Sequence, residues 1–321
     1  MNMMSGNTLI NERIFIAGHK GMVGSALWRR LKDYDVITLD KSKLDLINQQ
    51  SVEEFFAEYK PTMVVNCAAK VGGILANNSF KGEFIFNNLQ ISANIINQSH
   101  KHGVKKLINL GSSCIYPKQC EIPIVEESLL SGKLEPTNEP YAIAKIAALK
   151  TCESYFYQYG SNFYSLMPCN LYGFGDNFDL ETSHVLPALM RKIDHAKRNN
   201  INCVEIWGSG KPLREFLFVD DLAEAIEFCL INIDAENIYS QGVSHLNCGS
   251  EEEVSIMELV YLISDVIGYK GDFSFDSSKP DGTFRKKMDN SRMTDSGFTA
   301  RTKLKDGLKM TYKWFKELNL S

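Results

Sequence analysis

The sequence predicts an α/β fold with a doubly wound parallel sheet and a smaller, mixed α/β lobe toward the C-terminus. Three observations predict it. A chain of 321 residues allows about two domains, apolar strands alternate with amphipathic helices up to about residue 170, and a glycine-rich turn follows the first strand. Apolar residues make up 44% of the chain and charged residues 23%, which argues against a disordered, collagen-like or coiled-coil protein.

The first part of the chain alternates strand and helix in order. Short apolar runs predict strands at 13–17, 36–39, 62–67, 106–110 and 163–167. Apolar residues at helical spacing predict helices at 22–31, 52–58, 84–102 and 141–159. About five parallel strands are then in place by residue 170, in a sheet covered by helices on both faces.

The alternation is less regular after residue 170. We expect helices at 185–197, 222–231, 256–267 and 304–318, and short strands at 204–207, 245–247 and 273–275. The expected domains are 1–170 with about 215–248, where the chain returns to add outer strands, and 171–214 with 249–321. Ligands bind outside the carboxyl ends of such sheets, so a cleft between the two domains is the expected site.

Charge and cysteine content limit the partners. The 35 basic and 39 acidic residues leave a net charge of −4 without a Lys/Arg block, so neither nucleic acid nor an anionic membrane is an expected partner. No apolar run is long enough to span a membrane, and residues 1–11 lack a signal-peptide pattern, so we expect a cytoplasmic protein. The eight cysteines include no Cys-x-x-Cys pair, which predicts reduced thiols and no metal site.

The turn after the first strand has the spacing Gly-x-x-Gly-x-x-Gly. It consists of Gly18, His19, Lys20, Gly21, Met22, Val23 and Gly24. Glycines allow a tight turn and the close approach of backbone to a pyrophosphate, and the following helix N-terminus offers free N–H groups. Its place between first strand and first helix indicates a Rossmann-type dinucleotide site.

The end of the second strand carries conflicting signals for the choice of nicotinamide cofactor. Asp40 is typical of NAD sites, where an acidic side chain binds the ribose 2′-OH. Lys41 and Lys43 follow it and Lys20 lies in the glycine turn, and lysines there favour the 2′-phosphate of NADP. The residues alone leave both cofactors open.

A candidate catalytic group follows the fourth strand. Tyr141 and Lys145 are four residues apart, hence on one face of a helix. A nearby ammonium is expected to lower the pKa of the tyrosine and make it a proton donor to a carbonyl undergoing reduction. Ser112, at the end of the fourth strand, is placed to hydrogen-bond the same carbonyl oxygen.

The glycine turn, Ser112 and Tyr141-x-x-x-Lys145 together resemble the extended short-chain dehydrogenase/reductases that act on nucleotide sugars. Within that group the chain is most similar to the GDP-L-fucose synthase family, which epimerises and reduces GDP-4-keto-6-deoxymannose. The stretches that carry this narrower resemblance are 16–25, 68–74, 111–117, 135–145, 170–173, 207–210, 214–216 and 279–283.

The resemblance implies roles for single residues. Ser112, Tyr141 and Lys145 would form the reductase triad, with NADPH as hydride donor. Cys114 and His184 would be the base and acid that invert C3 and C5 of the keto sugar, because protons next to a carbonyl are acidic. The family also implies a homodimer that packs helices 84–102 and 141–159 into a four-helix bundle.

The resemblance further implies two sets of ligand contacts. NADP would contact the glycine turn together with Asp40, Lys41, Ala68, Leu110, Gly111, Lys145, Pro168, Asn170, Leu171 and His184. The GDP-linked sugar would contact Lys192, Trp207, Arg214, Asp281 and Lys286. Lys192 stands where the family has arginine, and Asp40 is unusual in a family that uses NADP.

Other interpretations compete with these. Cys114 is also typical of a buried packing thiol, as expected for the other seven cysteines, and His184 of a helix cap. Sibling enzymes acting on GDP-4-keto heptoses or 3,6-dideoxy sugars would share the same motifs, because substrate size changes pocket shape only. A UDP-sugar 4-epimerase and a catalytically silent NADP-sensing protein are less favoured alternatives. A dehydratase would carry Asp-Glu where this chain has Ser113-Cys114.

Overall fold

A six-stranded parallel sheet forms the centre of the larger part of the molecule. The computed structural model describes residues 9–180, 182–279 and 281–318. The sheet has the order β2-β1-β3-β4-β5-β9, and every pairing in it is parallel. Its strands are β1 (Arg13–Ala17), β2 (Asp35–Ile37), β3 (Met63–Asn66), β4 (Lys106–Leu110), β5 (Phe163–Pro168) and β9 (His245–Cys248). The α/β fold predicted from the strand and helix alternation is confirmed.

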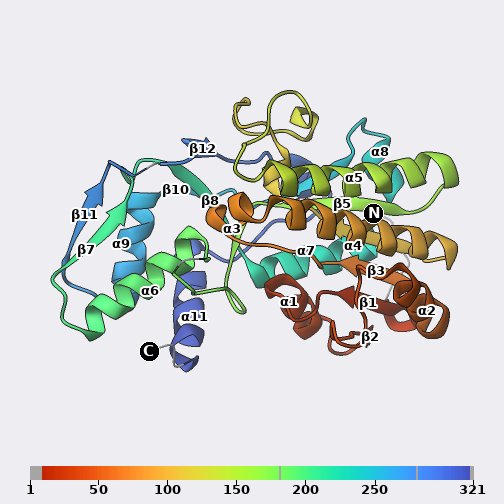
Figure 1. Ribbon diagram of the computed structural model, residues 1–321, viewed down its shortest axis with the longest axis horizontal. Coiled ribbons are helices and arrows are strands. Elements are labelled where there is room, and N and C mark those ends of the chain that lie inside the picture. The colour runs from red at the N-terminus through yellow and green to blue at the C-terminus, as the bar shows by residue number, and fades with distance from the viewer. Residues whose placement is uncertain (1–8, 181, 280, 319–321) are drawn as a thin grey trace, which may run out of the picture.

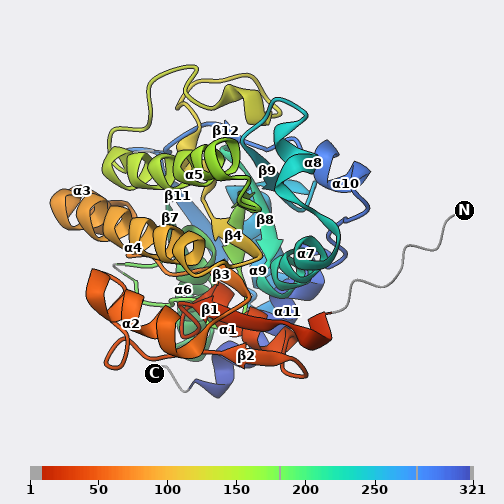
Figure 2. The same ribbon diagram turned by 90° about the vertical axis from the view of Figure 1, so that its right-hand side faces the viewer.

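Helices cover both faces of this sheet (Figure 2). On one face, α1 (Met22–Arg30) packs against α7 (Val219–Asn232). On the other, α4 (Lys81–Lys101) packs between α2 (Gln49–Tyr59) and α5 (Glu139–Tyr159). Successive side chains of β1 serve opposite faces, since Ile14 packs with the α1 side and Phe15 with the α2 side. Burial on both faces explains why the strands are continuous apolar runs rather than alternating ones.

The rest of the chain forms a smaller part around β8 (Leu213–Phe218), at the left of Figure 1. β8 pairs in parallel with β6 (Asn170–Tyr172) and β12 (Arg285–Lys286), and antiparallel with β10 (Glu253–Ser255). A separate parallel pair joins β7 (Cys203–Trp207) and β11 (Asp272–Asp276). Three helices, α6 (Val185–Arg198), α9 (Ile256–Ile267) and α11 (Leu304–Glu317), enclose a second apolar core with these strands.

The structure differs from the prediction in its shortest elements. Sequence periodicity missed β6, β8, β10 and β12, together with α3 (Ile74–Ser79), α8 (Ala235–Tyr239), α10 (Ser291–Asp295) and three 3₁₀ turns at Leu9–Asn11, Ser113–Ile115 and Glu126–Ser128. Of the outer strands expected after residue 214, β9 joins the large sheet, whereas β8 belongs to the smaller one. How the chain divides into domains stays a prediction.

The strand order places the carboxyl ends of β1, β3, β4 and β5 at one edge of the large sheet. The smaller part of the molecule lies beyond this edge (Figure 1). Within the described ranges, no helix is both long and apolar enough to cross a bilayer.

Candidate active site

A single cavity of about 2230 Å³ runs from the glycine turn, past the carboxyl ends of β3 and β4, to the smaller part of the molecule. All the residues predicted for catalysis, cofactor contact or substrate contact line it. The cavity therefore brings together residues that are up to 268 positions apart, from Gly18 to Lys286 (286 − 18).

The glycine turn is shaped by two close backbone contacts. A Cβ on Gly18, whose φ is +83°, would lie 2.8 Å from backbone atoms of Ala68. A Cβ on Gly24 would lie 2.2 Å from the carbonyl oxygen of Gly18. Gly21 is the N-cap of α1 and has no side chain to satisfy the first N–H groups of that helix. The cradle therefore fits a bound pyrophosphate, with its anionic charge at the helix N-terminus.

Asp40 contacts two side chains of the glycine turn. Its carboxylate lies 2.9 Å from the Nζ of Lys20 and 3.2 Å from the Nε2 of His19. The hydrogen bond from Lys20 lowers the pKa of Asp40. The acidic and basic signals that conflict in the sequence thus pair with each other, and Asp40 supports two side chains of the turn.

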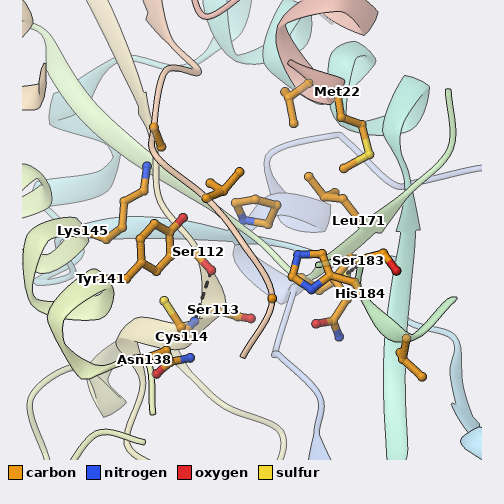
Figure 3. A pocket seen from close by; sticks show the side chains of 18 of the residues that line it. Met22, Ser112, Ser113, Cys114, Asn138, Tyr141, Lys145, Leu171, Ser183 and His184 are labelled. Atoms are coloured by element: carbon orange, nitrogen blue, oxygen red, sulfur yellow. Dashed lines mark hydrogen bonds between the residues drawn. The ribbon is translucent and has the colours of Figure 1, made fainter. Parts of the chain in front are cut away.

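Ser112, Tyr141 and Lys145 meet at the carboxyl end of β4. Ser112 begins the 3₁₀ turn Ser113–Ile115, and its Oγ accepts a hydrogen bond from the backbone N–H of Cys114 at 3.4 Å. Figure 3 shows Tyr141 and Ser112 pointing toward the same region of the pocket. Lys145 is buried, donates from Nζ to the carbonyl of Leu110 at 2.8 Å, and lies 5.8 Å from the centre of the Tyr141 ring.

The prediction that the Lys145 ammonium lowers the pKa of Tyr141 is wrong. Burial raises the pKa of Tyr141, and the neighbouring Cys114 raises it further, while the Ser112 hydroxyl opposes the shift. Burial also lowers the pKa of Lys145 to about 8. The reason is that desolvation penalises both charged forms, and the ammonium is held on a carbonyl oxygen instead of at the phenol.

Cys114 and His184 project from opposite sides of the pocket (Figure 3). Cys114 is 8% exposed, and burial raises the pKa of its thiol, whereas Lys286, Ser112 and Lys145 act to lower it. His184 is the N-cap residue of α6, but its side chain makes no capping hydrogen bond, so it is not the structural cap that the sequence also allowed. Its ring reaches the cavity, whose walls desolvate it and lower its pKa.

The predicted substrate contacts surround the far end of the cavity. Trp207 is 64% exposed, and the Nζ atoms of Lys192 and Lys279 lie 5.2 and 5.5 Å from the centre of its ring. Asp281 accepts hydrogen bonds from the backbone N–H and the hydroxyl of Ser209 at 2.6 and 2.8 Å, and the backbone bond lowers its pKa most. Trp207 is therefore not the core aromatic that its residue type also allowed.

Sequence reasoning missed several groups in this cavity. Lys279 and Asn138 line it, and Asn138 precedes Tyr141 by three residues, a helical spacing that was a usable signal. The expectation that seven cysteines only pack the core is also wrong. Cys203 is exposed, and three further thiols line the cavity: Cys67, Cys120 and Cys169.

Comparisons with known proteins agree with this geometry. Residues 14–249 match the model of the NAD dependent epimerase/dehydratase family. A GDP-L-fucose synthase of Sinorhizobium fredii is 51% identical, with 96% of each chain covered. The GDP-L-fucose synthase of Escherichia coli is 48% identical over 95% of this chain and 97% of that protein. A GDP-D-glycero-L-gluco-heptose synthase of Campylobacter jejuni, solved in the presence of NADPH, superposes with a TM-score of 0.90 at 37% identity over 95% of this chain and 98% of that one.

Proposed function

The chain belongs to the NAD dependent epimerase/dehydratase family, and we propose that it is an NADPH-dependent enzyme that converts GDP-4-keto-6-deoxy-D-mannose to GDP-L-fucose. The reaction combines epimerisation at C3 and C5 with reduction at C4. The observation that carries the proposal is the placement of a thiol and an imidazole on opposite sides of one pocket, beside a serine, tyrosine and lysine. A simple reductase has no need of the first pair.

The two ends of the cavity suit the two ligands. The glycine turn, with Lys20 and Lys41 nearby, would hold the pyrophosphate and 2′-phosphate of NADP. Lys192, Arg214 and the exposed face of Trp207 would hold the guanosine diphosphate. In this arrangement NADP would bind mainly to the first expected domain, residues 1–170 with about 215–248. The GDP-sugar would bind mainly to the second, residues 171–214 with 249–321.

Epimerisation follows from the acid–base properties of the opposed pair. The Cys114 thiolate removes a proton from the carbon next to the C4 carbonyl, and the C–H electrons form an enolate whose oxygen is held by Ser112 and Tyr141. The His184 imidazolium returns a proton to the other face of that carbon. Because burial lowers the pKa of His184, its charged form is a stronger acid than an exposed histidine.

Reduction uses the same carbonyl oxygen. NADPH, when bound, supplies the hydride for C4. Tyr141 donates its proton to the oxygen, and its raised pKa keeps the phenol protonated until charge develops there. Lys145 donates to the Leu110 carbonyl and keeps a cation 5.8 Å from the centre of the Tyr141 ring.

Turnover in D₂O tests the proposal. With GDP-4-keto-6-deoxymannose, we expect NADPH to be consumed and the product to carry deuterium at C3 and C5. Reduction without deuterium would remove Cys114 and His184 from their roles. Cys114→Ser should slow incorporation about 100-fold or more while NADPH still binds. Cys203→Ser, at an exposed thiol outside the cavity, is the matched control and should behave as the unmodified protein.

A sibling activity on a related GDP-4-keto sugar is the second candidate. The heptose synthase from Campylobacter jejuni shares the fold over nearly the whole chain, which favours this alternative over other chemistries. Comparison of kcat/KM for the 6-deoxyhexose and a heptose analogue distinguishes the two. A higher value for the heptose would replace the substrate in the proposal and keep the reaction class.

We also propose that the enzyme is a cytoplasmic homodimer formed through α4 and α5. These two helices pack side by side and carry exposed apolar side chains, among them Phe86, Leu89 and Ile143. Burial of such a face between two copies would form a four-helix bundle. Sedimentation equilibrium tests this state, and a monomer at micromolar concentration would contradict it.

A further inference from the structure

Asp40 lies where a dinucleotide-binding fold reads the adenosine ribose of its cofactor. It follows β2 and comes 22 residues after Gly18 (40 − 18), the first glycine of the turn. In such folds an acidic side chain at about this interval accepts a hydrogen bond from the ribose 2′-OH, which NADH carries and NADPH replaces by a phosphate. Asp40 lines the cavity, and its side chain is 41% exposed. A carboxylate here favours a 2′-hydroxyl and repels a 2′-phosphate.

The backbone that carries Asp40 is anchored on the protein core. The carbonyl of Asp40 accepts hydrogen bonds from the N–H groups of Lys43 at 2.8 Å and Leu44 at 2.9 Å. Leu44 is buried and packs in the apolar cluster on the α2 side of the large sheet. The turn that begins at Asp40 is therefore fixed at both ends, and the carboxylate starts from a defined position.

Two side chains of the glycine turn orient the Asp40 carboxylate. The Nζ of Lys20 lies 2.9 Å and the Nε2 of His19 lies 3.2 Å from the same oxygen, Oδ1. His19 is buried, and its ring meets that of Trp28 edge to face at a centroid distance of 5.9 Å. A carboxylate has about four lone-pair sites, so two donors leave it able to accept from a ribose hydroxyl.

Lys20 is the more easily displaced of these two partners. Its side chain is 72% exposed, and an exposed ion pair contributes little to stability. The ammonium can therefore leave Asp40 for a 2′-phosphate at small cost. Lys41, which is exposed and also lines the cavity, adds a second cation next to Asp40 in the chain. NADPH thus meets two cations as well as the carboxylate.

The formal charges at this end of the cavity cancel. Two segments flank the adenosine ribose in such folds, here the glycine turn and residues 39–47. The charged side chains that line the cavity from these segments are two lysines and two aspartates, Lys20, Lys41, Asp40 and Asp45. A phosphate carries a charge of about −1.5 to −2 at pH 7, so a site built for it alone would have an excess of cations. The balance instead suits both a neutral hydroxyl and a phosphate.

We propose that Asp40 makes this enzyme use NADH as well as NADPH, with the carboxylate accepting from the 2′-hydroxyl of NADH and Lys20 turning to the 2′-phosphate of NADPH. Both cofactors share the dihydronicotinamide, so the reaction balances in the same way: the hydride goes to C4 of the sugar, Tyr141 supplies the proton, and NAD⁺ is released. The inference rests on the proposed function for the keto sugar, whereas cofactor binding needs no sugar.

Fluorescence titration of the full chain with each reduced cofactor tests the binding. We expect the two Kd values of the unmodified protein to lie within about tenfold of each other. Asp40→Asn keeps the size of the side chain and removes its charge, so NADPH should bind more tightly and NADH more weakly. The ratio of the NADH to the NADPH Kd should then rise at least about tenfold. Lys20→Met should weaken NADPH binding about tenfold and leave NADH within about twofold.

Asp35→Asn is the matched control. It removes the same charge from β2, where Asp35 is exposed, pairs with Arg13 and lies outside the cavity, and it should leave the ratio unchanged. An equal shift in this control, an equal effect of Asp40→Asn on both cofactors, or an equal loss of both in Lys20→Met would overturn the inference. So would a preference for NADPH above about 100-fold in the unmodified protein, a measurement that needs no variant.

Turnover separates the failure of this inference from that of the proposed function. With GDP-4-keto-6-deoxymannose, we expect NADH to be oxidised with a kcat/KM within about tenfold of that for NADPH. Oxidation of NADPH alone, although both cofactors bind, would overturn the inference. Oxidation of neither, with both bound, would refute the proposed reaction and leave the role of Asp40 in cofactor binding intact.

Discussion

Replacement of Gly24 by alanine is a sharp test of the phosphate-binding turn. An added Cβ would lie 2.2 Å from the carbonyl oxygen of Gly18, and 2.7 Å from both the carbonyl carbon of Gly18 and the Cα of His19. All three are backbone atoms, so no side chain can rotate away. The turn or the helix must move by about 1 Å to restore ordinary contact, a displacement that overpacked sites resist.

The expected change in the free energy of unfolding for Gly24→Ala is the difference between two contributions. Alanine in a helix interior is favoured over glycine by about 1 kcal/mol. Overpacking against fixed atoms costs about 1–3 kcal/mol or more. We therefore expect Gly24→Ala to lower the free energy of unfolding by up to about 2 kcal/mol, and to weaken NADPH binding at least tenfold, about 1.4 kcal/mol, because the displaced turn no longer fits the pyrophosphate.

Gly82 provides the control for this substitution. It lies in the first turn of α4, and nothing lies within 4 Å of its added Cβ. Gly82→Ala should leave the free energy of unfolding unchanged or raise it by up to about 1 kcal/mol, with NADPH affinity unaltered. Urea unfolding and NADPH fluorescence titration measure both quantities. Equal stability and equal affinity for the two variants would refute the steric reasoning.

Three further predictions follow from buried or paired groups. Tyr141→Phe should slow NADPH oxidation by about 100-fold or more, because the proton donor is lost, and should slow deuterium exchange at C3 and C5 less, because Ser112 still holds the enolate oxygen. Equal losses by NMR and by NADPH oxidation would contradict this division of roles. Burial raises the pKa of Asp176 to about 7, and one of its oxygens is buried without a partner within the described ranges. Its folded pKa thus exceeds the ordinary 3.8 of the unfolded chain, so its contribution to stability is complete below pH 3.8 and is lost as the pH rises to about 7. At pH 8, Asp176→Asn should therefore have a higher urea midpoint than the unmodified protein, and this difference should be smaller at pH 5. A parallel pH dependence of the urea midpoint in both proteins would contradict this. Trp207→Ala should weaken GDP binding about tenfold by calorimetry, since the ring also orders Lys192 and Lys279, and unchanged affinity would place the guanosine elsewhere.

The elements that sequence periodicity located well carry local signals of their own. The helix predicted at 256–267 is α9, Ile256–Ile267, because Ser255 and Glu258 form a capping box at its start and Gly268, at φ +75°, ends it. The strand predicted at 13–17 is β1, Arg13–Ala17, a buried apolar run that a glycine turn terminates. By contrast, β12 has two residues and exists only through its pairing with β8, a partner 72 positions earlier at Leu213↔Arg285 (285 − 213).

The candidate site likewise has features that local sequence signals predict and features that depend on distant partners. The spacing of the glycine turn and the helical interval between Tyr141 and Lys145 are local properties, so the amino-acid sequence by itself predicted the α/β fold and the candidate reductase residues. Cys114 and His184 became candidates only through the family resemblance of the motifs. Tertiary structure alone decided how those groups ionise, because burial and distant partners set each pKa. It paired Asp40 with Lys20, raised the pKa of Tyr141 against the sequence-based expectation, and brought Cys114 and His184 to opposite sides of one pocket. Desolvation and charge pairing depend on distance in space, and no local pattern in the chain encodes that distance.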